Sequence, residues 1–359
     1  MEKTFGCCRF VYTLALEVKT SAYKSAGVSL SAFDLFYQLT DLKTVTPWLK
    51  EVDSQALQAS VKRIDRAFDN FFRGNGFPKF KKKSGHQSFQ CPNNTRRVDL
   101  EKGLLTIPKI KDIPIVLACP FSGKIKTITI YRTPTNKYFA SILVDNKKPL
   151  PPKPAITREK TIGIDVGVKQ FAVTSNGSFF EPNRHLKESL RRLQCLQRRA
   201  SRKKKGSSNR KKANLRVAIL HERISNQRKD YIHKITSRLI RDNQTETFVI
   251  EDLHVKGMLK NRSLSQAISD VSFSEFFRQM EYKCDWYGKN LIRIGRFEAS
   301  SKTCSACGEK NEALTLADRE WTCANCLTSH DRDLNAAKNI KEFGLKKAGE
   351  GISGAPVEP

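Results

Sequence analysis

The sequence contains no long apolar run and no obvious targeting segment. None of its stretches approaches the roughly 18 consecutive apolar residues that a membrane-spanning helix needs. Its first residues also lack the charged-then-apolar pattern of a signal peptide. These two absences argue against a membrane-spanning or secreted protein, and we expect a soluble, intracellular one.

Acidic residues are scarce relative to basic ones. The chain of 359 residues has 36 Asp and Glu against 65 Lys and Arg, a formal net charge of +29. A field of this sign attracts polyanions, and extended contact with nucleic-acid phosphates explains it best. A ribosomal-type protein or a membrane-surface protein would be the alternative. The length allows two or three domains with at least one sizeable core.

The ten cysteines lack the spacing of a disulfide framework. Six are scattered along the chain, and four form two C-x-x-C pairs with 15 residues between the pairs. Two such pairs place four thiolates around one tetrahedral Zn²⁺, and their separation is typical of a zinc ribbon. A redox pair or four unrelated buried cysteines is the alternative. The predicted zinc ligands are Cys304, Cys307, Cys323 and Cys326.

The N-terminal region is expected to be mainly helical. Within 54–72, apolar residues recur every three or four positions, which predicts one buried helix face. Residues 77–83 then interleave two phenylalanines with lysines, a pattern suited to stacking on bases beside phosphates. A solvated basic loop is the alternative. The nucleic-acid-binding candidates here are Lys79, Lys81, Lys82 and Lys83.

A series of short β-rich segments follows between residues 88 and 143. Four segments have the composition of strands and are separated by turns, so we expect a small antiparallel barrel or sheet. These segments are 104–107, 113–117, 125–131 and 138–144. Residues 146–154, with four prolines and three lysines, predict a linker and the main domain boundary.

A dense basic block lies within a predicted pair of helices over 186–239. Residues 191–216 include twelve Lys or Arg and no Asp or Glu, and a Gly-Ser-Ser at 206–208 interrupts the helical pattern. Such a block repels itself unless phosphates neutralise it. A solvated, disordered turn is the alternative when nothing is bound. The candidates for nucleic-acid contact are Arg198, Arg199, Arg202, Lys203, Lys204, Lys205, Arg210, Lys211, Lys212 and, further along, Arg228.

Two predicted strands contain a carboxylate that is unusual for a buried strand. Asp165 lies within 161–168, and Glu251 lies within 247–253. Burying a lone carboxylate costs several kcal/mol unless it is paired or binds a metal, so both are metal-ligand candidates. An acidic side chain on the solvent face of a strand is the alternative. Asp333 lies at the start of a helix predicted directly after the second C-x-x-C pair.

The order of elements favours an RNase H-like α/β fold. Two paired strands are followed by helices, a strand, a helix and a last helix. The helix before the zinc ribbon is predicted from Ser272 to Gly288, with Ser272 and Glu275 as a capping box. In this fold the three acids converge, and three carboxylates can hold two Mg²⁺. Two ions about 4 Å apart stabilise the attacking and leaving oxygens of an in-line displacement, which predicts phosphodiester hydrolysis.

On these motifs the chain resembles the TnpB family, the insertion-sequence-encoded, RNA-guided DNA endonucleases related to type V CRISPR nucleases. The resemblance runs over nearly the whole length. The stretches similar to the three RuvC motifs are 163–169, 250–253 and 331–337. The other similar stretches are the zinc ribbon at 300–326 and two shorter segments, 76–81 and 221–230.

The resemblance implies an α/β protein with an added β-barrel and helical region. An RNase H-like RuvC nuclease domain with an inserted zinc ribbon would follow a wedge-type β-barrel that carries an inserted helical recognition domain. Only five residues precede Gly6, where the family usually has a strand and a helix, so part of the first barrel strand is expected to be missing. The expected boundaries are 1–85 for the mainly helical recognition region, 86–155 for the barrel and linker, 156–300 for the first RuvC part with the basic helical pair at 186–240, 301–329 for the ribbon, 330–345 for the last RuvC helix and 346–359 for a disordered tail.

The resemblance also implies roles for single residues. The catalytic acids, which would hold two Mg²⁺ with Mn²⁺ as a substitute, are Asp165, Glu251 and Asp333. The residues expected to support them from behind are Asp331, Arg332 and Asn335. The four paired cysteines would hold one structural Zn²⁺. Leu327 follows the second cysteine pair, where glycine is common in the family, so the second knuckle is expected to be slightly strained.

The implied partners are a guide RNA of the ω type and a double-stranded DNA target beside a short target-adjacent motif, with no membrane. The protein would act as a monomer or a weak dimer on the RNA, in a prokaryotic cytoplasm and associated with the nucleoid. Two alternatives stay open: a catalytically weak RNA-guided DNA-binding regulator, and a guide-independent transposase or resolvase-like nuclease. The presence of all three acids favours the active nuclease over the regulator.

Overall fold

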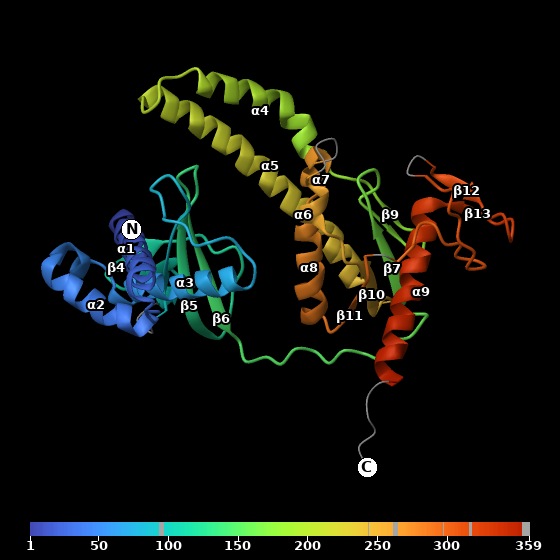
Figure 1. The fold of residues 1–359 in the computed structure, drawn as a ribbon, viewed down its shortest axis with the longest axis horizontal. Helices are drawn as coiled ribbons and strands as arrows, with labels where there is room; N and C mark the ends of the chain where they lie inside the picture. The colour runs from blue at the N-terminus through green and yellow to red at the C-terminus, as the bar shows by residue number, and fades with distance from the viewer. Residues whose placement is uncertain (93–96, 243, 261–264, 297, 316–317, 354–359) are drawn as a thin grey trace, which may run out of the picture. The chain divides into compact units, whose positions relative to one another are not determined.

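The computed structural model describes the chain except residues 93–96, 243, 261–264, 297, 316–317 and 354–359 (Figure 1). The chain divides into two compact units, Met1–Lys148 and Pro149–Pro359. The division falls inside 146–154, the stretch that the sequence predicts to be a linker. Each helix of the described residues is too short or too polar to span a membrane.

Helices form the first part of unit 1. They are α1 (Glu2–Ala26), α2 (Ala32–Val45), the short 3₁₀ helix η1 (Pro47–Glu51) and α3 (Ser54–Phe72). The apolar spacing of α3 gives the predicted buried face, with Leu57, Val61 and Ile64 in the core. Residues 2–26 form a single helix, so the truncated first barrel strand expected at the N-terminus does not form there.

The strands of unit 1 make two separate antiparallel sheets. One has the order β1 (Gln87–Cys91), β5 (Lys124–Arg132) and β6 (Tyr138–Asp145). The other has the order β2 (Arg97–Asp99), β3 (Leu104–Ile107) and β4 (Ile110–Pro114). The expected strand at 113–117 is therefore shifted toward the N-terminus. Among the described residues, the strands pair as two three-stranded sheets rather than as one closed barrel.

Unit 2 is built on a five-stranded mixed sheet. Its strand order is β11 (Asn290–Ile294), β10 (Thr247–Glu251), β7 (Thr161–Val166), β8 (Ala172–Thr174) and β9 (Phe179–Phe180). Strands β7, β10 and β11 are parallel, while β8 and β9 are added antiparallel. The β10 strand is buried through Ile250, in keeping with a central strand covered on both faces.

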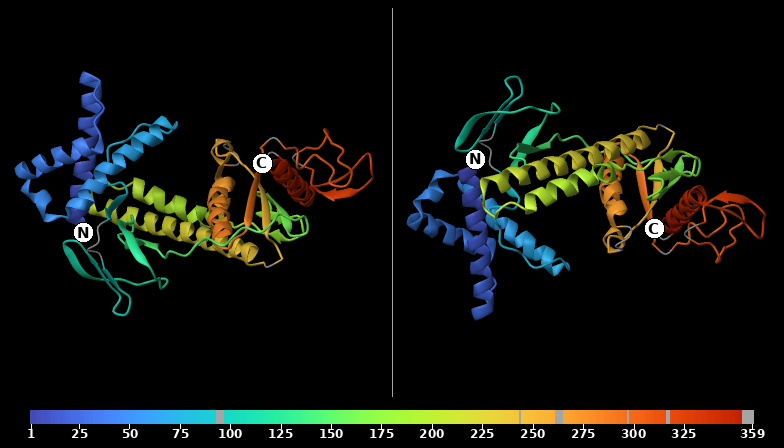
Figure 2. Two further views of the ribbon diagram at one scale, coloured as in Figure 1. Left: turned by 90° about the horizontal axis from the view of Figure 1, so that it is seen from below. Right: turned by 90° about the horizontal axis from the view of Figure 1, so that it is seen from above.

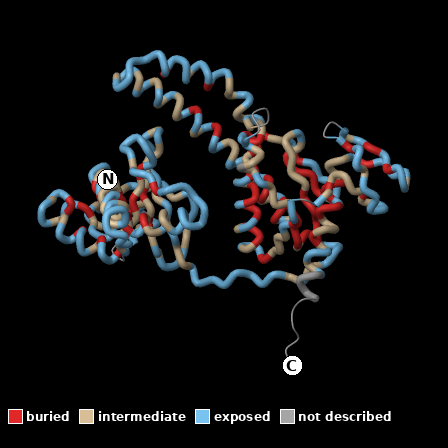
Figure 3. The backbone as a smooth tube through the Cα atoms, in the orientation of Figure 1, coloured by how far each residue is buried: buried red, intermediate tan, exposed pale blue. Residues whose placement is uncertain are grey.

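Helices cover both faces of this sheet (Figures 1 and 2). On one face α5 (Ser208–Arg241) and α8 (Phe273–Trp286) share a core with β7, β8 and β10. On the other face α9 (Arg332–Ser353) packs through Ile340 and Phe343 against β10 and β11. Burial is accordingly concentrated in the sheet and these flanking helices (Figure 3).

Two glycines let α9 approach the sheet closely. A Cβ atom at Gly163 of β7 would lie 2.1 Å from the carbonyl oxygen of Ala337 in α9. A Cβ atom at Gly344 of α9 would lie 2.4 Å from a methyl carbon of Val249 in β10. Both distances are shorter than any van der Waals contact, so only glycine fits at these crossings. This close packing fixes where the first turn of α9 lies relative to the strand ends.

The predicted basic helical pair forms a hairpin of α4 (His185–Ser201) and α5 (Figure 1). The Gly-Ser-Ser interruption becomes its turn, because Gly206 has a φ of 83° and the Ser207 hydroxyl accepts a hydrogen bond from the Arg210 amide at 3.2 Å. Most of the hairpin's residues beyond the sheet are exposed (Figure 3).

Two sequence predictions in unit 2 are wrong. Ser272 has a left-handed backbone with φ 60°, and its hydroxyl donates to the Ser269 carbonyl at 3.1 Å instead of capping α8, so the capping box with Glu275 does not form. The predicted disordered tail at 346–359 is also shorter than expected, because α9 continues to Ser353. The remaining six positions of that prediction, 354–359, lie outside the described residues.

Candidate functional site

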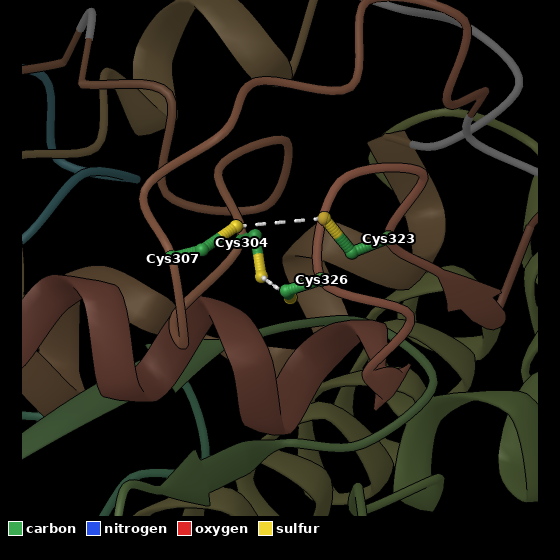
Figure 4. A group of neighbouring side chains, drawn as sticks. All are labelled: Cys304, Cys307, Cys323 and Cys326. Atoms are coloured by element: carbon green, nitrogen blue, oxygen red, sulfur yellow. Dashed lines mark hydrogen bonds between the residues drawn. The ribbon is translucent and has the colours of Figure 1, made fainter.

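The two C-x-x-C pairs converge on one point (Figure 4). Their sulfur atoms all lie within 4.8 Å of one another, with Cys304 and Cys326 3.6 Å apart and Cys307 and Cys323 also 3.6 Å apart. A short hairpin of β12 (Glu320–Thr322) and β13 (Ser329–Asp331) joins the second pair to α9. Four sulfur atoms grouped in this way form a Cys₄ site consistent with a tetrahedral zinc ion.

The two knuckles repeat one backbone geometry. The Gly308 amide donates to the Cys304 carbonyl at 2.9 Å, and the Leu327 amide donates to the Cys323 carbonyl at 3.0 Å. Both closing residues are left-handed, with φ 82° at Gly308 and φ 56° at Leu327. Glycine adopts this conformation freely, whereas a side chain such as leucine pays about 1–2 kcal/mol.

The ionisation of the thiols fits a cation better than an empty cluster. Hydrogen bonds from Thr328 lower the pKa of Cys326 to about 6, so this thiol is charged at neutral pH. Burial raises the pKa of Cys304 to about 11, because a thiolate removed from water needs a counter-charge. A bound cation would supply that counter-charge and favour the thiolate at both positions.

Asp165 and Glu251 lie at one end of the sheet. Strand β10 runs parallel to β7 with Ile250 opposite Ile164, so the next residue of each strand is one of the two acids. Because parallel strands end at the same edge, both carboxylates emerge there. This placement follows from the fold alone, since 86 positions separate the two residues in the sequence.

The charges of Glu251 and Asp333 act on Asp165 at this edge. Burial, and after it these two negative charges, raise the pKa of Asp165 to about 7 against an opposing effect of Arg332. Burial also raises the pKa of Glu251, opposed by a hydrogen bond from Ser300. Such a cluster of desolvated acids is unfavourable unless protons or cations neutralise it.

Asp333 comes from the first turn of α9. A terminal nitrogen of Arg319 lies 3.4 Å from each of its carboxylate oxygens. In the part of the chain that the structure describes, the four cysteines form the one group whose ligand atoms lie close enough together to hold an ion. The charges of Glu251 and Asp333 raise the pKa of Asp165, but the three acids do not form a second such group.

The residues predicted to support the acids have different contacts. Asp331 caps α9, because its carboxylate accepts from the Leu334 amide at 2.8 Å. Arg332 donates to the Thr315 carbonyl at 3.3 Å, and its charge opposes the raised pKa of Asp165. Asn335 is buried and binds the segment that leads into the ribbon: it donates to the Thr303 carbonyl at 2.7 Å and accepts from the Ser305 amide at 2.9 Å.

Four residues of this region were not predicted from the sequence: Ser300, Arg319, His330 and Asn339. Three of them are buried polar side chains, namely Ser300, His330 and Asn339. The available signal was the spacing of Asn335 and Asn339, which places two amides on one face of α9. The roles of Ser300 and Arg319 can be recognised only from the structure, which brings these two residues into contact with the acids.

Most predicted nucleic-acid contacts lie on open surface. In the helical hairpin these exposed cations are Arg198, Arg199, Arg202, Lys203, Lys204, Lys205, Lys211 and Lys212, and Arg210 beside them is half-buried and donates to the Lys203 carbonyl at 2.8 Å. In unit 1, Lys79, Lys82 and Lys83 are exposed. Lys81 differs, because it lies 4.0 Å above the Tyr12 ring and burial lowers its pKa to about 8.

Arg228 is not placed for a phosphate contact. Its Nε donates to the Asp270 carboxylate at 2.9 Å, and its side chain is only 17% exposed. The same carboxylate accepts from the amides of Leu186 and Lys187 at the start of α4. Arg228 therefore fastens the helical hairpin to α7 (Ser265–Val271), which corrects its prediction as a nucleic-acid-binding residue.

Three sequence families match parts of the chain. The OrfB_IS605 family, described as "Probable transposase", matches residues 141–262. The TNB domain of Cas12f1-like proteins matches residues 273–340, which contain the ribbon and the start of α9. A helix-turn-helix domain of the OrfB_IS605 proteins matches residues 1–27, which in this structure form one helix and its terminal glycine.

Curated relatives are similar over almost the whole chain. A protein of Streptomyces pristinaespiralis named "Putative RNA-guided DNA endonuclease" is 39% identical, covering 98% of this chain and 88% of the relative. InsQ of Escherichia coli K12, which has the same description, is 30% identical, covering 100% of this chain and 92% of the relative. Mimivirus proteins named TnpB-like are 27% identical over 62% of this chain.

A solved structure has a similar fold. The Cas12f1 chain of a Cas12f1–sgRNA–target DNA complex matches with a TM-score of 0.59, covering 94% of this chain and 81% of that one. The sequence identity is 18%, so the match bears on the fold alone. It agrees with a mixed α/β architecture.

Proposed function

This chain belongs to the OrfB_IS605 family of TnpB-like proteins, and from that premise we propose that it is an RNA-guided DNA endonuclease of a transposable element. It cleaves DNA that is matched by a bound non-coding RNA beside a short target-adjacent motif. The observation that carries the proposal is the place of Asp165 and Glu251 at the shared end of β7 and β10, where the charge of Asp333 from α9 also acts on Asp165.

The architecture of unit 2 supports an RNase H-like nuclease domain. Three parallel strands with an antiparallel pair at one edge, covered by helices on both faces, give the two central strands one shared end. Two of the acids lie at that end, and α9 delivers the third. The close packing at Gly163 and Gly344 supports this delivery, because it holds α9 against β7 and β10.

The three acids would hold two Mg²⁺ ions, with Mn²⁺ as a substitute. Carboxylate oxygens are the ligands that these hard cations prefer, and the raised pKa of Asp165 indicates a cluster that lacks neutralising charge. When bound, such ions supply Lewis-acid stabilisation of charge on phosphate oxygens during phosphodiester hydrolysis. Arg319 and Arg332 stand beside the acids as further positive charges.

The four cysteines would hold one structural Zn²⁺. The ribbon's own hydrophobic core is small, with Leu314 and Trp321 as its buried residues besides the cysteines. A core of this size contributes little folding free energy, so metal binding would supply the remainder. The ribbon would then support the segments on either side of it.

The exposed cations of the α4–α5 hairpin would bind phosphates of the guide RNA or of the RNA–DNA heteroduplex. These cations have long, exposed side chains, whereas Lys234 and Arg228 of the same hairpin form ion pairs with Asp230 and Asp270. In such systems base pairing reads the sequence, and the protein binds the backbone and shape. We expect the protein to act beside chromosomal DNA, in association with the nucleoid.

The test is to express the protein with the DNA that flanks its gene, purify the complex and sequence the bound RNA. The expected result is one discrete RNA whose end matches that flanking DNA, together with Mg²⁺-dependent cutting of a matching duplex. Discrete RNA and tight target binding without cutting would identify a regulator instead. Cutting that persists after the RNA is removed would identify a guide-independent nuclease.

A further inference from the structure

Ser300 connects the zinc ribbon to the carboxylate cluster. Its hydroxyl donates to an oxygen of Glu251 at 2.5 Å, although 49 positions separate the two residues. The residue is 7% exposed and lies four positions before the first zinc-ligand candidate, Cys304. No other hydrogen bond to the Glu251 carboxylate occurs among the described residues, so this hydroxyl is the group that orients it.

The backbone of Ser300 is held by α9. The Asn339 side-chain amide donates to the carbonyls of Ser300 at 2.7 Å and Thr303 at 2.6 Å. Asn335, one turn earlier on the same helix, donates to the Thr303 carbonyl and accepts from the Ser305 amide. Both asparagines are buried, and their helix also carries Asp333. The segment 300–305 is therefore fixed to the helix that supplies the third acid.

Residues of the ribbon also contact the region of the third acid, Asp333. The ring nitrogen Nε2 of His330 lies 3.0 Å from the sulfur of Cys304, and this ring packs against Trp321. His330 is buried and stands three residues before Asp333. Arg319, also from the ribbon, contacts the Asp333 carboxylate directly. Two of the three acids are thus in contact with ribbon segments, while Asp165 comes from the sheet.

We propose that Ser300 is a positioning residue for Glu251, and that the zinc-loaded ribbon together with Asn335 and Asn339 of α9 sets the place of Ser300. The proposal rests on the proposed function, because it gives Glu251 the role of a ligand to a divalent cation. A glutamate has a long side chain, and a single hydroxyl donor selects which of its orientations faces Asp165 and Asp333. Groups that orient a metal ligand in this way typically change metal affinity or activity by about 10–100-fold when they are removed.

The test compares Ser300→Ala, Ser300→Thr and the neighbouring Ser301→Ala. Ser301 belongs to the same segment, and its hydroxyl makes no hydrogen bond to the described residues, so its variant is the matched control. Binding of Mn²⁺ to the zinc-loaded protein is measured by calorimetry, with Asp165→Ala as the background. In parallel, the Mg²⁺ concentration for half-maximal cutting is measured on the complex with guide RNA and target DNA.

For Ser300→Ala we expect Mn²⁺ binding about tenfold weaker and a similar rise in the Mg²⁺ requirement, with cutting recovered at high Mg²⁺. Ser300→Thr keeps the donor and should stay close to wild type, and so should Ser301→Ala. Zinc content and target binding without Mg²⁺ should be unchanged in all three. If Ser300→Ala does not fold, Ser300→Cys, with a similar shape and a weaker donor, should show a smaller shift in the same direction.

Two failures can be told apart. If Asp165→Ala binds Mn²⁺ as well as wild type does, the acids are not the cation site and the proposed function fails with the positioning role. If Asp165→Ala loses Mn²⁺ binding while Ser300→Ala or Ser300→Cys binds it like wild type, the positioning role alone is overturned. A Ser300→Ala protein that loses zinc and cutting together, without rescue by high Mg²⁺, also overturns it, because the residue would then be structural.

Discussion

The two proposed metal sites of unit 2 are assembled in opposite ways. The cysteine cluster comes from one short segment, 304–326, whose two knuckles each close with their own backbone hydrogen bond. The carboxylate cluster takes one acid from each of β7, β10 and α9. A local site can be recognised from spacing, whereas a dispersed site depends on sheet register and helix packing. Changes in the two regions should therefore fail in different ways.

The largest effect is expected from removing an acid. Asp165→Ala, Glu251→Gln or Asp333→Ala should lower target cutting by about a thousandfold or more, since the loss of a central catalytic group has effects of this order. Guide RNA binding should survive, because the exposed cations are unchanged. Single-turnover cleavage and RNA co-purification measure the two outcomes. Asp331→Asn is the matched control, because it keeps an oxygen that accepts from the Leu334 amide and should therefore keep most of the activity. Full cutting by any of the three acid variants would refute the assignment.

The next largest effect should come from the ribbon. Cys304→Ser removes one of four thiol ligands, so the protein should lose zinc and the ribbon should become sensitive to protease. Cutting should fall by about tenfold or more, because Ser300 and Arg319 lose their fixed places. Zinc analysis, limited proteolysis and cleavage assays measure these results. Cys119→Ser, at an exposed cysteine outside the cluster, should change none of these results. If the zinc-free protein cut its target as fast as wild type does, the ribbon would not be needed to place the acids.

The third largest effect is expected from disturbing the packing of α9 on the sheet, and it concerns stability. Gly344→Ala places a methyl group where Val249 already lies, so we expect a loss of about 1–3 kcal/mol in the free energy of unfolding. Gly349→Ala, on the same helix, meets no atom within 4 Å and should stabilise the protein by up to about 1 kcal/mol. Denaturant unfolding of both variants measures the contrast. Equal effects in the two variants would show that α9 does not press on β10.

The raised pKa of Asp165 predicts how stability depends on pH without added Mg²⁺. Its pKa of about 7 in the folded protein exceeds the ordinary value of about 3.9 for an aspartate. Between these values the folded protein binds more protons than the unfolded chain, so stability should fall as the pH rises from about 4 to 7. Asp165→Asn should flatten this fall and melt higher than wild type at pH 8. Thermal unfolding of both proteins across this pH range measures the effect. If the melting temperature of Asp165→Asn fell with pH as steeply as that of wild type, the prediction would be wrong.

The smallest effect concerns the second knuckle. Leu327→Gly should raise the stability of the ribbon by about 1 kcal/mol, because the left-handed conformation is unfavourable for leucine and not for glycine. The reciprocal change, Gly308→Leu, should lower it by a similar amount in the first knuckle. Zinc release under a chelator titration compares the two. A ribbon that holds zinc less tightly after Leu327→Gly would show that the exposed leucine has a role of its own.

The sequence predicted the local features of this molecule well. Spacing located the four cysteines, and the Gly-Ser-Ser interruption located the turn of the helical hairpin. It also selected Asp165 and Glu251, because carboxylates in apolar strands are rare unless something neutralises them, and the family resemblance added Asp333. The cysteine spacing and the hairpin turn depend on neighbouring residues only, and for these two features the prediction and the structure agree.

The errors and omissions concern contacts between distant segments. Arg228 reads as one more cation of a basic helix, yet Asp270 binds it across 42 positions. Ser300 lies in an ordinary polar loop, and only the fold brings it to Glu251. The capping box at Ser272 failed for a local reason, because its backbone is left-handed there. Pairings of this kind cannot be inferred from one sequence, since any of many cations or hydroxyls could have filled them.

The most direct test of the central claim is a cleavage assay on the purified protein–RNA complex with a target duplex that matches the RNA and a duplex that does not. We expect cutting of the matched duplex alone, only when Mg²⁺ or Mn²⁺ is present, and none by Asp165→Ala. Cutting of both duplexes, or cutting by Asp165→Ala at the wild-type rate, would contradict the claim.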